Sequence, residues 1–404
     1  MQRIKASQLK EGMRFSAPVF FDDGQNMFLA EDKPVKLMHI QALSRWRVPF
    51  LLTYGKLISD DSIYDENSTG LEELEDLEVL DDDIPLEQNV EYLEQIAKNF
   101  STKDSKLILE YKQILNDADR TYESIRLNQS ELVRSEIDTL CDDIIELVSK
   151  DYTDILSTIL TDDKEDSSIP KNAVITAIFS AILARHTNLA SRKLRQIITA
   201  ALLHDTGMLS VDPSILEKRE YLTSEEFNLV QLHIVRSTQY AQDQLFYSRE
   251  IGTIIQQHHE RWNGSGYPDR LRGSEIDIGS RIVSISDSFS AMLSRKSYRD
   301  SFDGYEAMKK LLDARELLFD PDLIKVFINI IGIYPIGSLV LLNNGAIAQV
   351  IKANSEMPLL PEIRILVSST KTPPVQVGDE ILLQGNQDLK ILRVIKQDEY
   401  RAAN

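Results

Sequence analysis

The histidines of this chain are few, and most of them fall within one stretch of the sequence. Only six occur in 404 residues, and four of these belong to a series that ends at an aspartate. In chain order the series is His204 and Asp205, then His233, then His258 and His259, and finally Asp287. Imidazole and carboxylate together form the ligand set that holds iron, manganese or zinc. We therefore interpret the stretch as a multi-metal hydrolase centre.

Apolar residues at helical spacing surround this series. Leu194, Ile197, Ile198, Ala201 and Leu202 form one apolar face that ends at His204. The whole pattern predicts four buried helices, each delivering a ligand at or near one end, as a metal site inside a helical bundle requires. A single histidine beside an apolar face is more often a structural residue, so the clustering favours the metal site. We interpret His186, near a predicted helix end, as a surface or core histidine.

The stretch from about Ser168 to Ile331 resembles the HD-GYP family of metal phosphohydrolases, which hydrolyse the second messenger cyclic di-GMP. Four features in the family's order and spacing carry the resemblance: ALLHDTGMLSVDPSILEK, the lone His233, HHERWNGSGYPDRL and RIVSISDSFSAMLSRKSYR. The segment SQLKEGM near the N-terminus resembles, with much weaker motifs, the accessory domain that precedes many such catalytic domains.

The resemblance implies a role for each matching residue. His204, Asp205, His233, His258, His259 and Asp287 match ligands of two divalent metal ions, iron or manganese, with Asp205 as the bridging catalytic carboxylate. Tyr267, in the Gly-Tyr-Pro loop, matches a residue that lines the substrate pocket, and Lys296 and Arg299 match a pair that holds substrate phosphate. The plainer alternatives are that Tyr267 braces its loop and that Lys296 and Arg299 are solvated surface charges.

The chain departs from the family pattern at several positions. Asn172 stands where the family has a further histidine, about 32 residues before the HD pair, so it is a doubtful ligand position. An amide oxygen is a much poorer ligand than imidazole for these metals. Ser168 replaces an acidic ligand of trinuclear members, Met208 replaces a lysine and Ile234 replaces a proline.

The resemblance implies metal-assisted hydrolysis of cyclic di-GMP to linear pGpG, or on to GMP. The departures at Asn172 and Met208 favour an alternative, a degenerate member that binds nucleotide or partner proteins with little or no turnover. The intact set of six ligands favours activity, because a domain released from catalysis has no need of them. Hydrolysis of another nucleotide phosphate is a third reading, against which the Gly-Tyr-Pro motif argues.

The patterns along the chain predict a mainly α fold. The expected order is an N-terminal accessory α+β module (1–58), an acidic linker (59–85), a helical region (86–164), the helical HD-GYP catalytic domain (165–334) and a small C-terminal β domain (335–404). Strands are expected over residues 14–21 and 26–30, and over 338–342, 346–352 and 362–367. The helical region is expected to pack within the chain, with pairing to a second copy as the alternative.

Composition limits the classes of partner. The formal net charge is −19, which argues against general nucleic-acid binding. Residues 59–83 contain twelve Asp or Glu and no Lys or Arg, as in a solvated linker. The sequence has no signal-peptide pattern and no apolar run long enough to span a membrane, so we expect a cytoplasmic protein. The expected partners are cyclic di-GMP, a homodimer mate or signalling proteins. The single cysteine, Cys141, is expected to be a buried core thiol.

Overall fold

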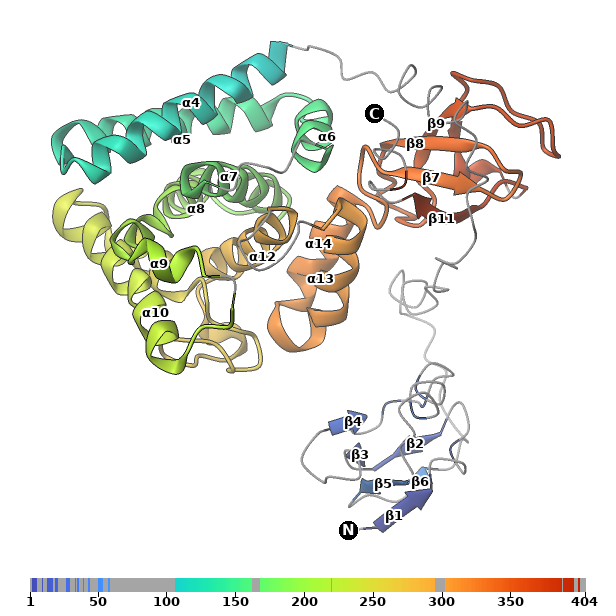
Figure 1. Ribbon diagram of the computed structural model, residues 1–404, viewed down its shortest axis with the longest axis horizontal. Helices are drawn as coiled ribbons and strands as arrows, with labels where there is room; N and C mark the ends of the chain where they lie inside the picture. The colour runs from blue at the N-terminus through green and yellow to red at the C-terminus, as the bar shows by residue number, and fades with distance from the viewer. Residues whose placement is uncertain are drawn as a thin grey trace. The chain divides into compact units, whose positions relative to one another are not determined.

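The computed structural model divides the chain into two compact units, Met1–Leu77 and Glu78–Asn404 (Figure 1). It describes short segments within residues 2–58, and then residues 106–161, 168–218, 220–294, 302–386, 388–395 and 399. The expected linker over 59–85, residues 86–105 of the expected helical region, and both Lys296 and Arg299 lie outside the described residues.

The N-terminal unit contains short antiparallel strands around a small apolar core. One sheet has the order β1 (Gln2–Lys5), β5 (Phe50–Thr53), β3 (Val19–Phe20), β4 (Met27–Leu29), and β2 (Arg14–Phe15) pairs with β6 (Leu57–Ile58). The single strand expected over residues 14–21 is therefore two strands in different sheets. Pro18 stands between them, and it has no backbone N–H to donate to a strand ladder. Strands β3 and β4, which pair antiparallel, lie within the two expected ranges, 14–21 and 26–30.

The second unit is helical as far as residue 331. Its helices are α4 (Lys106–Arg126), α5 (Ser130–Ser149), α6 (Thr153–Thr161), α7 (Ile169–Arg185), α8 (Ser191–Leu203), α9 (Pro213–Leu216), α10 (Ser224–Gln239), α11 (Arg249–Gln257), α12 (Ile278–Leu293), α13 (Gly304–Leu318) and α14 (Pro321–Ile331). Single turns η2 (Thr206–Ser210), η3 (Tyr240–Gln244) and η4 (Gly273–Glu275) join some of them. Among the described residues, no helix has the length and apolar character that crossing a membrane requires.

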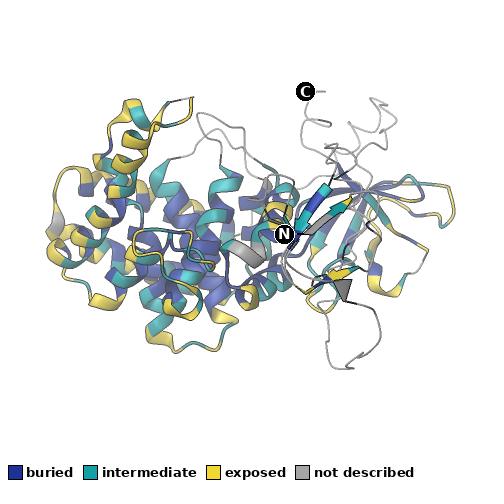
Figure 2. Ribbon diagram, turned by 90° about the horizontal axis from the view of Figure 1, so that it is seen from below, coloured by how far each residue is buried: buried dark blue, intermediate teal, exposed yellow. Residues whose placement is uncertain are grey.

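Helix α7 is the central element of this bundle. Every residue from Asn172 to Ala184 is buried, and the helix contacts α4, α5, α8, α12 and α14 (Figures 1 and 2). A helix that is apolar on all sides needs neighbours on all sides, which accounts for this position. Phe179 packs edge-to-face against Phe289 of α12 and Phe327 of α14, with ring centroids 5.2 and 5.9 Å away. The wall behind the candidate site is therefore a packed core.

A five-stranded antiparallel sheet follows the helices. Its strands are β7 (Leu339–Leu342), β8 (Ile347–Lys352), β9 (Glu362–Val367), β10 (Glu380–Leu382) and β11 (Ile391–Ile395), in the order β10-β9-β8-β7-β11, and η5 (Leu383–Gly385) follows β10. Three of them coincide with the expected strands to within one residue. Mainly helical structure with a small sheet at each end confirms the predicted fold class.

Candidate metal centre

The six side chains singled out from the sequence meet in one place inside the helical unit. The nitrogen and oxygen atoms that they offer form two overlapping groups, within each of which all atoms lie within 4.8 Å of one another. One group is Asp205, His233, His258 and His259; the other is His204, His258 and Asp287. Residues that span 83 positions of the chain thus share a single cluster.

Four different helices bring these side chains together. His204 and His258 occupy the C-terminal caps of α8 and α11, where the sequence analysis expected helix ends. His233 and Asp287 come instead from the middle of α10 and α12. The expectation that every ligand would lie near a helix end was therefore wrong for these two. Crossing helices can approach one another at their midpoints as well as their ends, so a mid-helix side chain reaches the cluster equally well.

The three most deeply buried imidazoles are oriented in the same way. The Nδ1 atoms of His204, His233 and His258 lie 2.7, 2.6 and 2.6 Å from the backbone oxygens three residues earlier, Ala201 O, Val230 O and Ile255 O. Nδ1–H therefore donates to the helix backbone, and each Nε2 is the nitrogen with a free lone pair. Outer hydrogen bonds of this kind fix the tautomer and orientation of metal-binding histidines.

The inner atoms of the cluster are left without hydrogen-bond partners among the described residues. Nε2 of His204, His233 and His258 and Oδ1 of Asp205 are all buried and unpaired. Asp205 Oδ1 lies 3.3 Å from His233 Nε2, and Asp205 Oδ2 lies 3.4 Å from His204 Nε2. Buried polar atoms are costly unless something satisfies them, and cations between these acceptors would satisfy all of them at once. The donor set fits the binding of divalent metal, which these nitrogen and oxygen atoms could hold.

The pKa shifts within the cluster also favour positive charge at this site. Burial alone would raise the pKa of Asp205, but the neighbouring His204 outweighs it and holds this pKa well below its usual value. Burial lowers the pKa of His258 to about 3, assisted by the charges of His204 and His233. For His204, by contrast, Asp205 and Asp287 overcome burial and raise the pKa well above its usual value. The carboxylates thus draw positive charge into a buried site, and a bound cation meets the same demand.

Gly207 allows the HD turn to lie directly on α10. A Cβ atom at this position would stand 2.3 Å from the backbone oxygen of His233, which is a severe overlap. The Gly207 backbone N–H also donates to Ser237 Oγ of α10 over 2.8 Å. This close approach sets the separation between Asp205 and His233.

Asn172 lies beside the cluster without being part of either ligand group. It is 8% exposed on α7, and its Nδ2 donates to Asp287 Oδ1 at 3.4 Å. Its Oδ1 accepts a 2.7 Å hydrogen bond from Ser290 Oγ. The amide therefore presents a donor, not an acceptor, towards the cluster. Ser168, the other departure on this helix, caps α7 by accepting the N–H of Lys171. His186 is exposed at the end of α7, away from the cluster.

The loop that follows the paired histidines folds back over them. The Tyr267 ring stacks on the His259 ring, with centroids 5.0 Å apart and planes at 28°. A Cβ atom at Gly266 would stand 2.4 Å from Arg261 N and 2.5 Å from His259 O, so only glycine permits this fold. Tyr267 thus both braces the loop and lines the pocket described below, so the two readings of this residue are compatible.

Glu260 anchors the same loop, a role that the sequence analysis did not foresee. Its carboxylate is 2% exposed and accepts the backbone N–H groups of Asp269 and Leu271 at 2.6 and 3.0 Å. Burial raises its pKa, although these donors lower it. The partners of Glu260 are backbone groups, so no side-chain pattern in the sequence reveals them. Its place directly after the histidine pair was the only available signal.

We expect Glu260→Gln to loosen this loop without removing any residue of the cluster. The amide nitrogen would face a backbone donor, and a hydrogen bond to a charged group contributes about 2 kcal/mol. Hydrogen exchange of the Asp269 and Leu271 amides should accelerate by roughly tenfold or more. Glu217→Gln, at an exposed glutamate, is the matched control and should leave these amides unchanged. Equal protection in both variants would show that Glu260 does not hold the loop.

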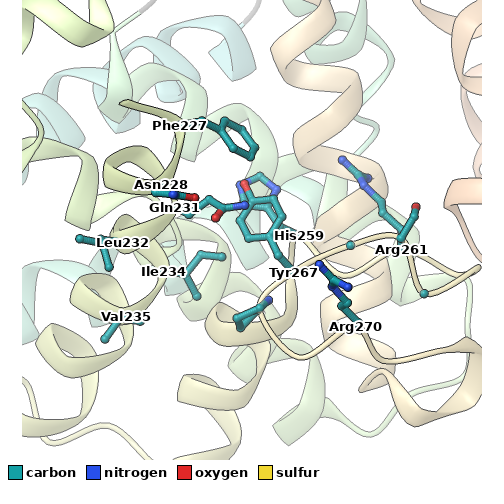
Figure 3. Close-up of a pocket in the computed structure, with 14 residues that line it drawn as sticks. Phe227, Asn228, Gln231, Leu232, Ile234, Val235, His259, Arg261, Tyr267 and Arg270 are labelled. Carbon is teal, nitrogen blue, oxygen red and sulfur yellow. The ribbon is translucent and has the colours of Figure 1, made fainter. Parts of the chain in front are cut away.

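A pocket of about 720 Å³ adjoins the cluster (Figure 3). Helix α10 forms one side of it through Phe227, Asn228, Gln231, Leu232, Ile234 and Val235, and the loop from His259 to Arg270 forms the other. His259 belongs both to the pocket lining and to the cluster. A ligand in this pocket would therefore contact the candidate metal centre.

Two arginines that line the pocket, Arg261 and Arg270, were not identified in the sequence analysis. Arg261 donates to Ser284 Oγ and Ser288 Oγ at 3.2 and 3.3 Å, and its guanidinium lies 5.1 Å from the centroid of the Phe319 ring. Arg270 has a positive φ of 56°. Neither guanidinium forms an ion pair with a carboxylate among the described residues. Both are cations that a phosphate-bearing ligand can use.

Comparison with known proteins agrees with this geometry. Residues 154–323 match the family described as HD domain, and residues 339–403 match the family described as KOW domain associated with HD domain. The match to the HD domain family over residues 154–323, together with the relatives below, agrees with the HD-GYP resemblance predicted from the sequence.

Several curated relatives align with the chain. It is 30% identical over 242 residues to the cyclic di-GMP phosphodiesterase PA4108 of Pseudomonas aeruginosa, across 59% of this chain and 58% of that protein. It is 28% identical to the cyclic di-GMP phosphodiesterase PdeB of Borreliella burgdorferi, across 56% and 60%. It is 27% identical to the 3′3′-cGAMP-specific phosphodiesterase 2 of Vibrio cholerae, across 56% and 42%. The chain thus spans less than two thirds of the length of each of these relatives.

Among solved structures, the HDG"Y"P protein Bd1817 of Bdellovibrio bacteriovorus aligns with 81% of this chain and 97% of its own, at 16% identity and a TM-score of 0.45.

Proposed function

We propose that the chain is a metal-dependent phosphodiesterase that hydrolyses cyclic di-GMP to linear pGpG. The observation that carries this proposal is the position of Asp205, whose two carboxylate oxygens each lie near a different imidazole, one of His204 and one of His233. A carboxylate placed in this way can bridge two cations. Two relatives that align with this region are named as cyclic di-GMP phosphodiesterases.

Each residue of the site has a distinct role in binding metal or substrate. Asp205, His233, His258 and His259 would hold one metal ion, and His204 and Asp287 would hold the other, together with Asp205. When bound, such a pair of ions makes hydroxide available from water near neutral pH and offsets the charge that develops on the phosphate. Tyr267 closes one side of the substrate pocket. Lys296 and Arg299 hold a substrate phosphate and compensate locally for the negative net charge of the chain.

One observation favours the alternative, a nucleotide-binding protein with little turnover. Asn172 donates its amide N–H to Asp287. It stands where the family has a histidine, so the side of the cluster formed by His204 and Asp287 lacks a further imidazole. Affinity for these metals follows ligand number and type, so this side should bind its ion weakly. Both functions require the pocket, so turnover of the nucleotide is what distinguishes them.

One experiment separates the two functions. The purified protein is incubated without oxygen, with ferrous iron or manganese and cyclic di-GMP, and the products are resolved by chromatography. Conversion to pGpG supports the phosphodiesterase. Binding of cyclic di-GMP in calorimetry, with no pGpG at saturating metal, would establish the binding protein in its place.

A further inference from the structure

The pocket beside the cluster is larger and more apolar than a phosphate group requires. Phe227, Leu232 and Val235 of α10 line it and are 45%, 42% and 47% exposed. Single exposed apolar residues are common on protein surfaces, but these three line one pocket. The pocket that they line also contains His259 of the cluster. A ligand that reaches the cluster can cover them with an apolar body.

The shape of this wall suits a flat ring. Figure 3 shows Phe227 near the ring of Tyr267, which stacks on His259, and labels Leu232 and Val235 on the same helix as Phe227. The Phe227 and Tyr267 rings are nearly perpendicular, at 73°, with centroids 6.1 Å apart. Aromatic and aliphatic groups arranged in this way offer contact to the faces of a nucleobase. The amides of Asn228 and Gln231 add polar groups to the same side.

On the opposite side of the pocket, the loop backbone positions the guanidinium group of Arg270. Arg270 has a left-handed backbone conformation, which is unfavourable for residues other than glycine. Glu260 fixes this conformation by binding the N–H groups of Asp269 and Leu271 on either side of it. The Arg270 side chain is exposed, lines the pocket and has no ion pair among the described residues. Its donors are available to a ligand.

We propose that this pocket is a guanine subsite, in which Phe227, Leu232 and Val235 contact the base and Arg270 donates to its O6 and N7 atoms. The inference rests on the proposed hydrolysis of cyclic di-GMP and assigns the specificity of that reaction. Guanine presents two acceptors at this edge, which match the fork of an arginine, whereas adenine presents one acceptor and one donor. The carbonyl oxygens of Asn228 and Gln231 can accept from the N1–H and N2–H groups of guanine.

The test compares variants on substrates with and without guanine. Phe227→Ala should raise the KM for cyclic di-GMP by about tenfold, the usual effect of removing a stacking ring. Arg270→Ala should lower kcat/KM for cyclic di-GMP by roughly tenfold, with little change for cyclic di-AMP. Arg270→Lys keeps the charge and loses the fork, so it should behave as Arg270→Ala does. Bis(p-nitrophenyl) phosphate has no base, so all three variants should lose much less activity on it than on cyclic di-GMP.

Two exposed residues that do not line this pocket serve as matched controls. Leu229→Ala removes another exposed apolar residue of α10 that does not line the pocket, and Arg249→Ala removes an exposed arginine elsewhere on the surface. Neither should alter the kinetics. Dissociation constants for cyclic di-GMP are measured in parallel, so the subsite can be judged even if turnover is absent.

The outcomes separate the two proposals. Wild-type hydrolysis of cyclic di-GMP that Phe227→Ala and Arg270→Ala leave unchanged overturns the guanine subsite and leaves the proposed function standing. Rescue by Arg270→Lys overturns base recognition in favour of a simple charge effect. If the wild type neither cleaves nor binds cyclic di-GMP but cleaves the base-free diester, both the substrate and its subsite are wrong.

Discussion

Asp205→Ala should leave the protein with almost no bound metal and lower cyclic di-GMP hydrolysis by more than about 100-fold, since losing even an outer partner of a metal ligand costs 10–100-fold. The reason is geometric. The two oxygens of Asp205 lie 3.3 and 3.4 Å from imidazole nitrogens of both halves of the cluster. Its removal weakens both metal positions at once, whereas loss of one histidine weakens mainly one.

Two comparisons make this result specific. Asp243→Ala removes an exposed carboxylate of the same unit and should change neither metal content nor rate. Lys296→Ala should retain metal and lose activity, because the family resemblance implies that Lys296 binds the substrate. Metal content is measured by mass spectrometry after anaerobic purification. If Asp205→Ala and Lys296→Ala retain equal metal, Asp205 does not bridge the two ions.

Asn172→His should have the second largest effect, in the opposite direction. Asn172 is buried against Asp287, at the edge of the half of the cluster that has fewer ligands. An imidazole there would add a ligand, and we expect affinity for the second metal ion to rise by at least about tenfold. Because hydroxide generation by a bridged pair needs both ions, the rate at low metal concentration should rise as well.

The control for this variant is Asn172→Ala. It breaks the hydrogen bonds with Asp287 and Ser290 without adding a ligand, so it should not raise metal content. Metal titrations of the wild type and both variants, followed by product formation, give the comparison. If Asn172→His changes neither affinity nor rate, the second position has been lost for reasons beyond one ligand, and the binding protein becomes the better account.

The parts of the site that could be predicted from the sequence are those with unusual chemistry. Imidazoles are rare in this chain, so their spacing identified the cluster that the structure brings together. Apolar periodicity identified the helices that carry it, because burial of one helix face imposes that period. The mid-helix origin of His233 and Asp287 escaped prediction, because crossing points depend on how four helices pack and not on any one of them.

The parts that could not be predicted depend on backbone contacts. Glu260 binds N–H groups nine and eleven residues away, and Gly207 is needed because its turn touches the backbone of His233. Backbone groups are the same at every residue, so such contacts leave little trace in a side-chain pattern. The apolar residues of α10 that line the pocket are visible in the sequence, because Phe227, Leu232 and Val235 are apolar but lie outside the buried face around His233.

Anomalous diffraction tests the central claim most directly. Crystals are grown anaerobically with ferrous iron, and data are collected on either side of the iron absorption edge. The account predicts two peaks, each roughly 2.0–2.3 Å from its ligand atoms, with Asp205 contacting both. The stronger peak should lie among His233, His258 and His259, and the weaker one beside His204 and Asp287. A map with no peak among these six side chains, or with His233 turned away from His258 and His259, would contradict it.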